Sequence, residues 1–178
     1  EIPLQVSPSN YPPSLSSANL TPDPAFKTSV LNCEALGWSD ADGDPPGWTF
    51  AWYRNETVLS GQMGQTLEGS SFDRGDSLSC EVTPFDGLLS GDPVVSNTVL
   101  VVNSPPTAPA VLLSPLPSAA THDDLECSIL TESEDPDGDV LTNPDSYSVS
   151  WQLDGVDVPE FDGEWTIPSG VTDLGEMW

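Results

Sequence analysis

A loop of alternating aspartates followed by a tryptophan-bearing segment occurs twice in this chain, once in residues 38–54 and again in residues 133–155. The acidic positions of the first loop recur in order, 95 positions later, in the second: Asp40, Asp42 and Asp44, then Asp135, Asp137 and Asp139. The flanking segments also agree in order, because "TSVLNC" matches "HDDLEC" and Trp52 matches Trp151. Such ordered agreement indicates a tandem repeat of about 95 residues, which sets the domain plan of the chain.

The alignment predicts that the chain begins and ends out of register with its modules. Residues 1–6 match residues 98–103 and are predicted to be the last strand of a preceding repeat. Residues 7–103 form one complete repeat, and residues 104–178 form a second that lacks counterparts of its last two strands. We expect the second repeat to be completed either by chain beyond Trp178 or by a strand from an adjacent copy.

Turn-forming residues are frequent, with 19 Pro and 14 Gly among 178 residues, and no helical periodicity persists. This composition predicts an all-β fold. The dipeptide Asp154-Gly155 is typical of a two-residue hairpin turn, and Asn55-Glu56 is its weaker counterpart in the first repeat. Seven strands, the number expected of a β-sandwich, are predicted in the complete repeat. They lie near residues 15–20, 29–36, 48–54, 57–60, 64–72, 77–84 and 93–102.

The chain is strongly acidic, with 29 Asp+Glu against 3 Lys+Arg and a formal charge of −26. That balance argues against binding to nucleic acid or to an anionic membrane, because both need basic patches. Most carboxylates have no basic partner, so they must be solvated, screened by salt or neutralised by divalent cations. A solvated acidic surface accounts for much of the charge. No apolar run is long enough to span a bilayer, so no membrane insertion is expected in this segment.

Cys33, Trp52 and Cys80 fall on the second, third and sixth predicted strands, and this order resembles the Cys–Trp–Cys pattern of the immunoglobulin fold. The wider set "D-x-D-G-D … W-Y-x-N … G-D-x-x-x-C-E-V-T-P-x-D-G" resembles immunoglobulin-like repeats, related to PKD and cadherin-like modules, of large secreted bacterial and archaeal proteins. The resemblance implies tandem seven-stranded sandwiches, each with a disulfide between its sheets, here Cys33–Cys80 with Trp52 packed against it. Cys127 then matches Cys33, and its partner is expected two residues beyond Trp178. The alternative is three buried thiols in a reducing compartment.

The aspartate loops are candidate calcium sites. Calcium takes six to eight oxygen ligands in irregular geometry, which suits carboxylates at alternate positions of a curling loop. In an immunoglobulin-like sandwich the loop "TPFDGLLSGDP" lies at the same end as the first aspartate loop, so Asp86 is a further candidate ligand. If calcium lies at a junction between modules, Asn10 is another candidate at the first site and Asn103 at the second. The alternative is an acidic turn without an ion. The predicted metal ligands are Asp40, Asp42, Asp44, Asp86, Asp135, Asp137 and Asp139.

No catalytic set stands out, and the chain is not predicted to be an enzyme. Asn19 and Asn55 fit the N-glycosylation pattern. The function expected from the resemblance is an extracellular, cell-surface structural or adhesive segment, a stalk, filament or surface layer, stiffened by Ca²⁺ and disulfides. Its partners would be neighbouring repeats, identical subunits or surface glycans. The alternative is a carbohydrate-binding accessory module of an extracellular enzyme, with tryptophans supplying a sugar-stacking platform: Trp38, Trp48 and Trp165.

Overall fold

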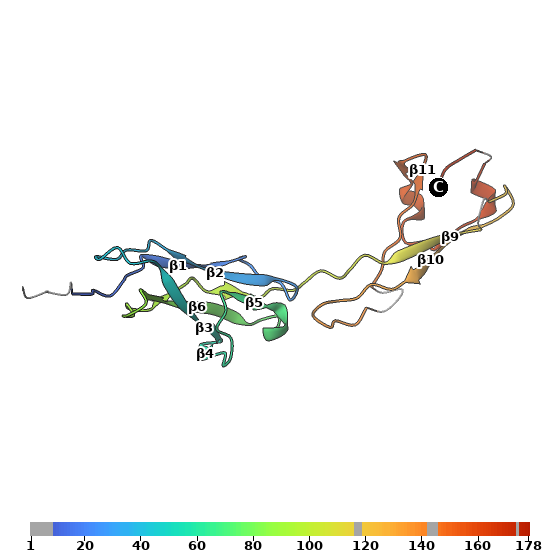
Figure 1. Ribbon diagram of the computed structural model, residues 1–178. Helices are drawn as coiled ribbons and strands as arrows, with labels where there is room; N and C mark the ends of the chain where they lie inside the picture. Colours follow the sequence, from blue (N-terminus) through green and yellow to red (C-terminus); the bar gives the residue numbers. More distant parts are fainter. Residues whose placement is uncertain (1–8, 116–118, 142–145, 174) are drawn as a thin grey trace, which may run out of the picture. The chain divides into compact units, whose positions relative to one another are not determined.

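The computed structural model describes residues 9–115, 119–141, 146–173 and 175–178, and the chain divides into two compact units (Figure 1). The first unit runs to Ser104 and the second begins at Pro105, next to the boundary expected from the repeat. The strand predicted at residues 1–6 lies outside the described residues. Both units are built from antiparallel sheets, so the all-β prediction is confirmed.

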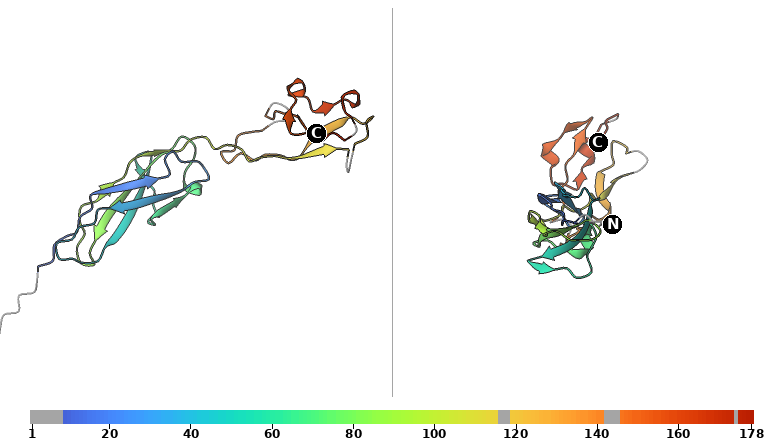
Figure 2. Two further views of the ribbon diagram at one scale, coloured as in Figure 1. Left: turned by 90° about the horizontal axis from the view of Figure 1, so that it is seen from above. Right: turned by 60° about the vertical axis from the view of Figure 1, so that its left-hand side comes forward.

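The described residues of the first unit form two antiparallel sheets (Figure 2). The buried side chains between these sheets form one apolar core. One sheet has the strand order β1-β2-β5, and the other has the order β4-β3-β6-β7, with β8 also paired to β6. The strands of the first sheet are β1 (Ser17–Thr21), β2 (Val30–Leu36) and β5 (Thr66–Glu68). The strands of the second are β3 (Gly47–Arg54), β4 (Thr57–Val58), β6 (Ser77–Phe85), β7 (Val94–Val95) and β8 (Val99–Leu100).

Period-two alternation explains how these strands build the core. In β6 every second residue is buried, while the residues between are partly exposed. Successive side chains of a strand point to opposite faces, so one face of β6 meets the other sheet. Both sheets contribute fully buried side chains to one cluster, and this arrangement is a two-layered β-sandwich. The largest of them are Trp52, Phe72, Leu20, Leu31, Leu67 and Leu78.

The predicted disulfide is present and joins the two sheets. Cys33 on β2 is bonded to Cys80 on β6, with their Cα atoms 6.3 Å apart. Trp52 stands opposite Cys80 in the β3–β6 register and is fully buried. Its indole N–H donates a hydrogen bond to the carbonyl of Gly64 at 2.8 Å, so the polar edge of the ring is satisfied inside the core.

Two strand predictions for the first unit are wrong in extent. The strand predicted at 93–102 is divided into β7 and β8, because the side chains between them replace backbone pairing. The Ser96 hydroxyl accepts the N–H of Cys80 at 3.1 Å, and the Asn97 amide bonds both backbone groups of Leu20 at 2.8 and 3.2 Å. The described residues 9–104 therefore contain eight strands, whereas seven were predicted for the complete repeat.

The strand predicted at 64–72 is shortened to β5 and is followed by a 3₁₀ turn, η1 (Gly69–Ser71). The backbone of Gly69 lies directly against the carbonyl of Lys27, where any Cβ atom would collide. This close approach ends the strand and requires glycine.

The second unit contains a three-stranded sheet of order β13-β10-β9 and a separate β11–β12 hairpin. Its fully or nearly buried apolar residues, among those described, are Leu125, Trp151 and Ile167. The described part of this unit also contains the 3₁₀ turns η2 (Pro159–Phe161) and η3 (Ser169–Val171). The strands are β9 (Ala110–Ser114), β10 (Leu125–Thr131), β11 (Gln152–Leu153), β12 (Val156–Asp157) and β13 (Thr166–Ile167).

Hydrogen bonds of the first unit recur at matching positions in the second. The indole N–H of Trp151 bonds to the Glu164 carbonyl at 2.8 Å, as that of Trp52 does to Gly64. The N–H of Cys127 bonds to the Trp165 carbonyl at 2.9 Å, and β10 pairs with β13 as β2 pairs with β5. The repeat found in the sequence is therefore a structural repeat, in which β9 to β13 are the counterparts of β1 to β5.

Candidate metal centre

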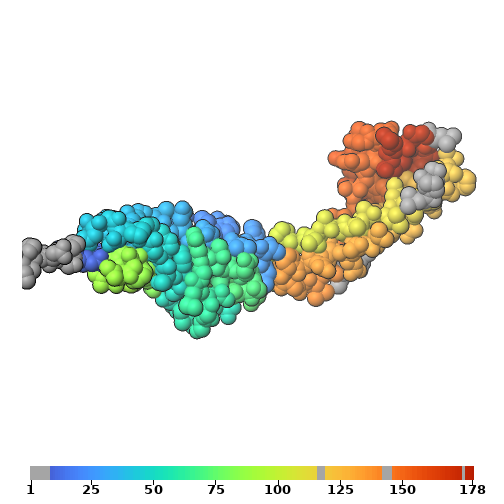
Figure 3. All heavy atoms as spheres, viewed as in Figure 1, coloured from blue at the N-terminus to red at the C-terminus, as the bar shows by residue number. Residues whose placement is uncertain are grey.

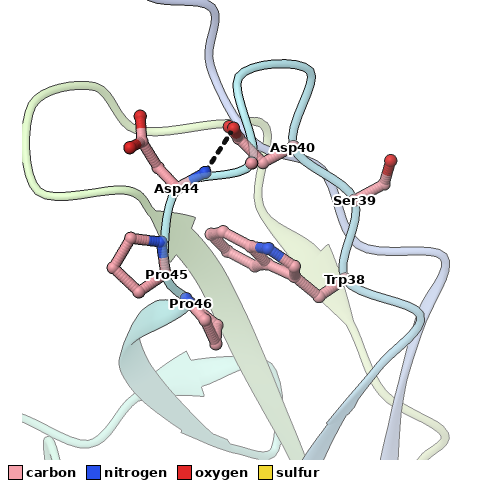
Figure 4. Close-up of a pocket in the computed structure, with 7 residues that line it drawn as sticks. Trp38, Ser39, Asp40, Asp44, Pro45 and Pro46 are labelled. Atoms are coloured by element: carbon pink, nitrogen blue, oxygen red, sulfur yellow. Dashed lines mark hydrogen bonds between the residues drawn. The ribbon is translucent and has the colours of Figure 1, made fainter.

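The first aspartate loop connects β2 to β3 and is organised by its own first carboxylate. Oδ1 of Asp40 accepts the backbone N–H of Asp42 at 2.9 Å. The same oxygen accepts the backbone N–H of Asp44 at 3.0 Å (Figure 4). Gly43 has a φ of +78°, which lets the backbone turn back between the second and third aspartates. The loop thus curls around Asp40, as the alternating spacing predicts.

The curl brings three carboxylates together. Asp40, Asp42 and Asp44 each place one carboxylate oxygen within 4.8 Å of the other two. Oδ2 of Asp40 is buried and has no hydrogen-bond partner. A buried carboxylate oxygen without a donor carries a desolvation cost that a cation could offset. An all-oxygen, all-carboxylate set suits a hard cation such as Ca²⁺.

The electrostatics of the loop are those of crowded negative charge. Partial loss of water around Asp44, followed by the charges of Asp40, Asp86 and Asp42, raises the pKa of the Asp44 carboxyl above its ordinary value of 3.8. Asp44 is therefore harder to ionise in the folded protein than in the unfolded chain. A bound cation would reverse this effect by favouring the charged form.

Asp86 lies close enough to affect Asp44 but is not one of the three grouped carboxylates. Its Oδ1 accepts the N–H groups of Leu88 and Leu89, both at 2.7 Å, and its Oδ2 accepts the Asn10 amide at 2.9 Å. These bonds, above all that from Leu89, lower the pKa of this nearly buried carboxyl. The structure thus gives Asp86 an organising position in the β6–β7 loop, while its predicted role as a metal ligand stays a prediction.

The segment that enters the first unit is fastened to both acidic loops. Asn10 donates to Asp86, and the backbone N–H of Tyr11 donates to Oδ2 of Asp42 at 2.7 Å. Figure 3 shows the entering segment, the aspartate loop and the β6–β7 loop in blue, cyan and yellow-green, gathered at one end of this unit. The sequence predicts Asn10 as a further metal ligand at this end, and the structure shows its amide bonded to Asp86. The bond from Tyr11 had no sequence signal, because it uses only the backbone.

An aromatic depression of about 500 Å³ adjoins the carboxylates. The ring of Trp38 lies between the aspartates and two prolines in Figure 4. Trp38 also meets Trp48 edge to face, with centroids 5.3 Å apart and ring planes at 80°. Trp48 is 36% exposed, and Trp165, in the other unit, is half-buried. The residues that line the depression are Trp38, Ser39, Asp40, Gly43, Asp44, Pro45 and Pro46.

The second aspartate loop repeats the hydrogen bonds of the first. Oδ1 of Asp135 accepts the N–H of Asp137 at 2.8 Å and that of Asp139 at 3.4 Å, and Gly138 has a φ of +82°. Among the residues that the structure describes, only the first loop gathers three carboxylates within 4.8 Å of one another. The second loop therefore has the same fold but not the same close grouping.

The two candidate glycosylation residues differ in their surroundings. Asn55 has a φ of 51° in the β3–β4 turn, its amide nitrogen donates to Asp76 at 2.7 Å, and its oxygen accepts the N–H of Ser77 at 2.9 Å. A glycan on Asn55 would be attached to the same amide nitrogen that donates the hydrogen bond to Asp76. Asn19 is half-buried on β1, opposite Glu34.

None of the helical turns in the described parts of the chain has the length or apolar character needed to cross a membrane. Comparisons of the chain with family models, with curated proteins and with solved structures found no match.

Proposed function

We propose that this chain is a segment of an extracellular array of immunoglobulin-like modules, in which Ca²⁺ bound by the aspartate loops stiffens the end where each module is entered. The observation that carries the proposal is the group formed by Asp40, Asp42 and Asp44 within 4.8 Å, together with the buried, unpartnered Oδ2 of Asp40. Three carboxylates leave several of the six to eight coordination positions of calcium for water or carbonyl oxygens.

Calcium would stiffen the entrance to the module because the aspartate loop contacts the entering segment. Asp42 belongs to the grouped carboxylates and also accepts the N–H of Tyr11. An ion that fixes Asp42 would therefore fix the start of the entering segment. The adjoining bond from Asn10 to Asp86 holds the same segment to the β6–β7 loop. Calcium would in this way restrict bending at the entrance to the module, as a stalk or surface layer requires.

The covalent framework supports an extracellular setting. The Cys33–Cys80 disulfide closes a 47-residue separation inside the first unit, and such bonds persist mainly in oxidising compartments. The formal charge of −26 also suits an environment with abundant cations. On this proposal the partners are neighbouring modules of the same type or identical subunits.

Calorimetric titration of the full chain with calcium tests the proposal. We expect a dissociation constant of about 10⁻⁴–10⁻³ M, the range of extracellular modules. Asp40→Asn should abolish the tighter site, because asparagine can still accept the two backbone N–H bonds of the loop but replaces the buried Oδ2 with an amide. The loop around Asp135 is proposed as a weaker site, since its carboxylates are less closely grouped.

Asp23→Asn is the matched control, because it removes the same charge from an exposed position. It should leave binding unchanged. A wild-type chain that gives neither heat nor a melting shift with calcium would contradict the proposal. Equal binding by wild type and Asp40→Asn would also contradict it.

A second candidate function, carbohydrate binding, is favoured by the open depression beside Trp38. An indole ring next to carboxylates that can hold calcium offers a stacking face and a cation to a sugar. The nearby ring of Trp48 stands at 80° to it, so one ring face, not a row, is available. Titration with cellohexaose in calcium buffer checks this function: Trp38→Ala should remove a fluorescence change that the wild type shows. No change in the wild type would count against this candidate.

A further inference from the structure

Among the described residues, the second unit has an unpaired strand edge at the position where β3 and β6 pair in the first unit. In the first unit, β3 is paired over its whole length with β6, from Gly47 opposite Phe85 to Arg54 opposite Leu78. The counterpart β11 pairs with β12 on one side. On its other side, no strand among the described residues is paired with it. Backbone groups along such an edge are a ready template for another strand.

The core beside this edge has fewer buried residues than the core of the first unit, although Trp178 packs against it. Buried apolar residues of the second unit are Leu125, Trp151 and Ile167 among those described, and Val149 and Cys127 are only partly buried. In the first unit the matching space is filled from β6. The side chains that fill it are Leu78, Cys80 and Val82.

The register of a strand on this edge is already set. In the first unit Ser77, the first residue of β6, exchanges hydrogen bonds with Asn55 at 2.9 Å in each direction. In the second unit Met177 makes the same pair of bonds with Asp154, at 2.7 and 3.1 Å. Because Trp52 stands opposite Cys80, the residue opposite Trp151 would occupy the position of Cys80.

Cys127 occupies the position of Cys33. Both cysteines lie on the central strand of their sheet. The N–H of Cys33 donates to the Gln65 carbonyl, and the N–H of Cys127 donates to the Trp165 carbonyl, both at 2.9 Å. Cys33 is bonded to Cys80, whereas Cys127 is a half-buried thiol whose pKa is raised by burial. A raised pKa disfavours the reactive thiolate, so the site does not have the features of a catalytic cysteine.

We propose that the edge formed by residues 147–153 accepts an antiparallel strand of the β6 type, with apolar residues at alternate positions and a cysteine opposite Trp151 that forms a disulfide with Cys127. The occupant is a strand from the same kind of repeat, because the first unit shows what covers this edge. Strand addition of this kind obtains affinity from main-chain hydrogen bonds and specificity from pockets for alternate side chains. The inference rests on the structural repeat and does not depend on calcium.

The bond can form by thiol–disulfide exchange. The Cys127 thiolate attacks the cysteine sulfur of a strand whose thiol is held as a mixed disulfide with glutathione. A new disulfide forms, and the electron pair leaves with the glutathione thiolate, which takes a proton from water. The mixed disulfide is the oxidant in this exchange.

The test uses the full chain, with its Cys33–Cys80 bond intact, and a synthetic peptide of residues 79–90 carrying Cys80 as the glutathione mixed disulfide. Residues 76–78 are left out because Met177 and Trp178 of the chain already follow the register of Ser77 and Leu78. A matched peptide has Ser79 and Cys80 exchanged, which keeps the composition but turns the cysteine to the other face of the strand. We expect the native peptide to be captured about a hundredfold faster, because docking replaces ~10 µM free peptide with an effective concentration in the millimolar range.

Mass mapping should locate the new bond at Cys127, and the Cys127→Ser chain should capture neither peptide. Equal rates for the two peptides would overturn the proposal, as would failure to capture the native one. A second copy of the chain covering the edge, seen as a dimer that excludes the peptide, would also overturn it. In a separate measurement, the Cys80→Ser peptide should raise the melting temperature of the second unit of the Cys127→Ser chain, and no rise would contradict strand docking.

Discussion

Replacement of both bonded cysteines, Cys33→Ala with Cys80→Ala, should lower the free energy of unfolding of the first unit by about 4 kcal/mol. The bond spans 47 residues, and opening a loop of that size returns this amount of conformational free energy to the unfolded chain at 25 °C. Both cysteines are fully buried, so lost contacts with neighbours add a smaller cost. Removal of the half-buried thiol by Cys127→Ala should cost about 1 kcal/mol or less.

Native-state hydrogen exchange measures each unit separately. In the double variant, amides of the β3–β6 ladder should exchange about a thousandfold faster, since every 1.4 kcal/mol is a factor of ten. The Cys127 amide, bonded to the Trp165 carbonyl in the other unit, should keep its wild-type rate. If these exchange rates rise by less than about tenfold, the disulfide does not stabilise the first unit by the expected loop entropy.

Two further changes probe local interactions of the first unit. Without calcium, Asp44→Asn should raise the free energy of unfolding at neutral pH and lose this advantage in acid. Because folding raises the pKa of Asp44, the stability that the protonated carboxyl contributes is full below the pKa of the unfolded chain and is lost as pH rises through the pKa of the folded protein. Urea unfolding of wild type and variant across the pH range shows whether the two stability curves converge in acid. Asn97→Ala should cost about 2–4 kcal/mol, because it leaves both backbone groups of buried Leu20 unsatisfied, whereas Asn19→Ala on the same strand should cost far less in the same assay.

Much of the architecture follows from short-range patterns in the sequence. The strands predicted at 29–36, 48–54 and 77–84 match β2, β3 and β6 to within one residue at each end. Asp154 and Gly155 have positive φ angles, as their hairpin prediction requires. The resemblance to immunoglobulin-like repeats supplied the disulfide pairing. The curl of the aspartate loop followed from alternate carboxylates separated by a glycine.

What the sequence did not predict depends on contacts between distant segments. The division of β7 from β8 is caused by Asn97 reaching Leu20, 77 residues away. The bond from Tyr11 to Asp42 joins a backbone amide to a side chain 31 residues away. Such bonds have no local periodicity, since they depend on which loops the folded sheets bring to one end.

Terbium luminescence measures the binding of a cation to the first aspartate loop. Tb³⁺ is a hard cation that takes oxygen ligands, and Trp38 lines the same depression as Asp40 and Asp44, so excitation of the indole should sensitise a bound ion. We predict emission that calcium displaces, that Asp40→Asn abolishes and that Asp23→Asn leaves intact. If the wild type gives no sensitised emission, or if Asp40→Asn gives full emission, the first aspartate loop does not bind a cation through Asp40.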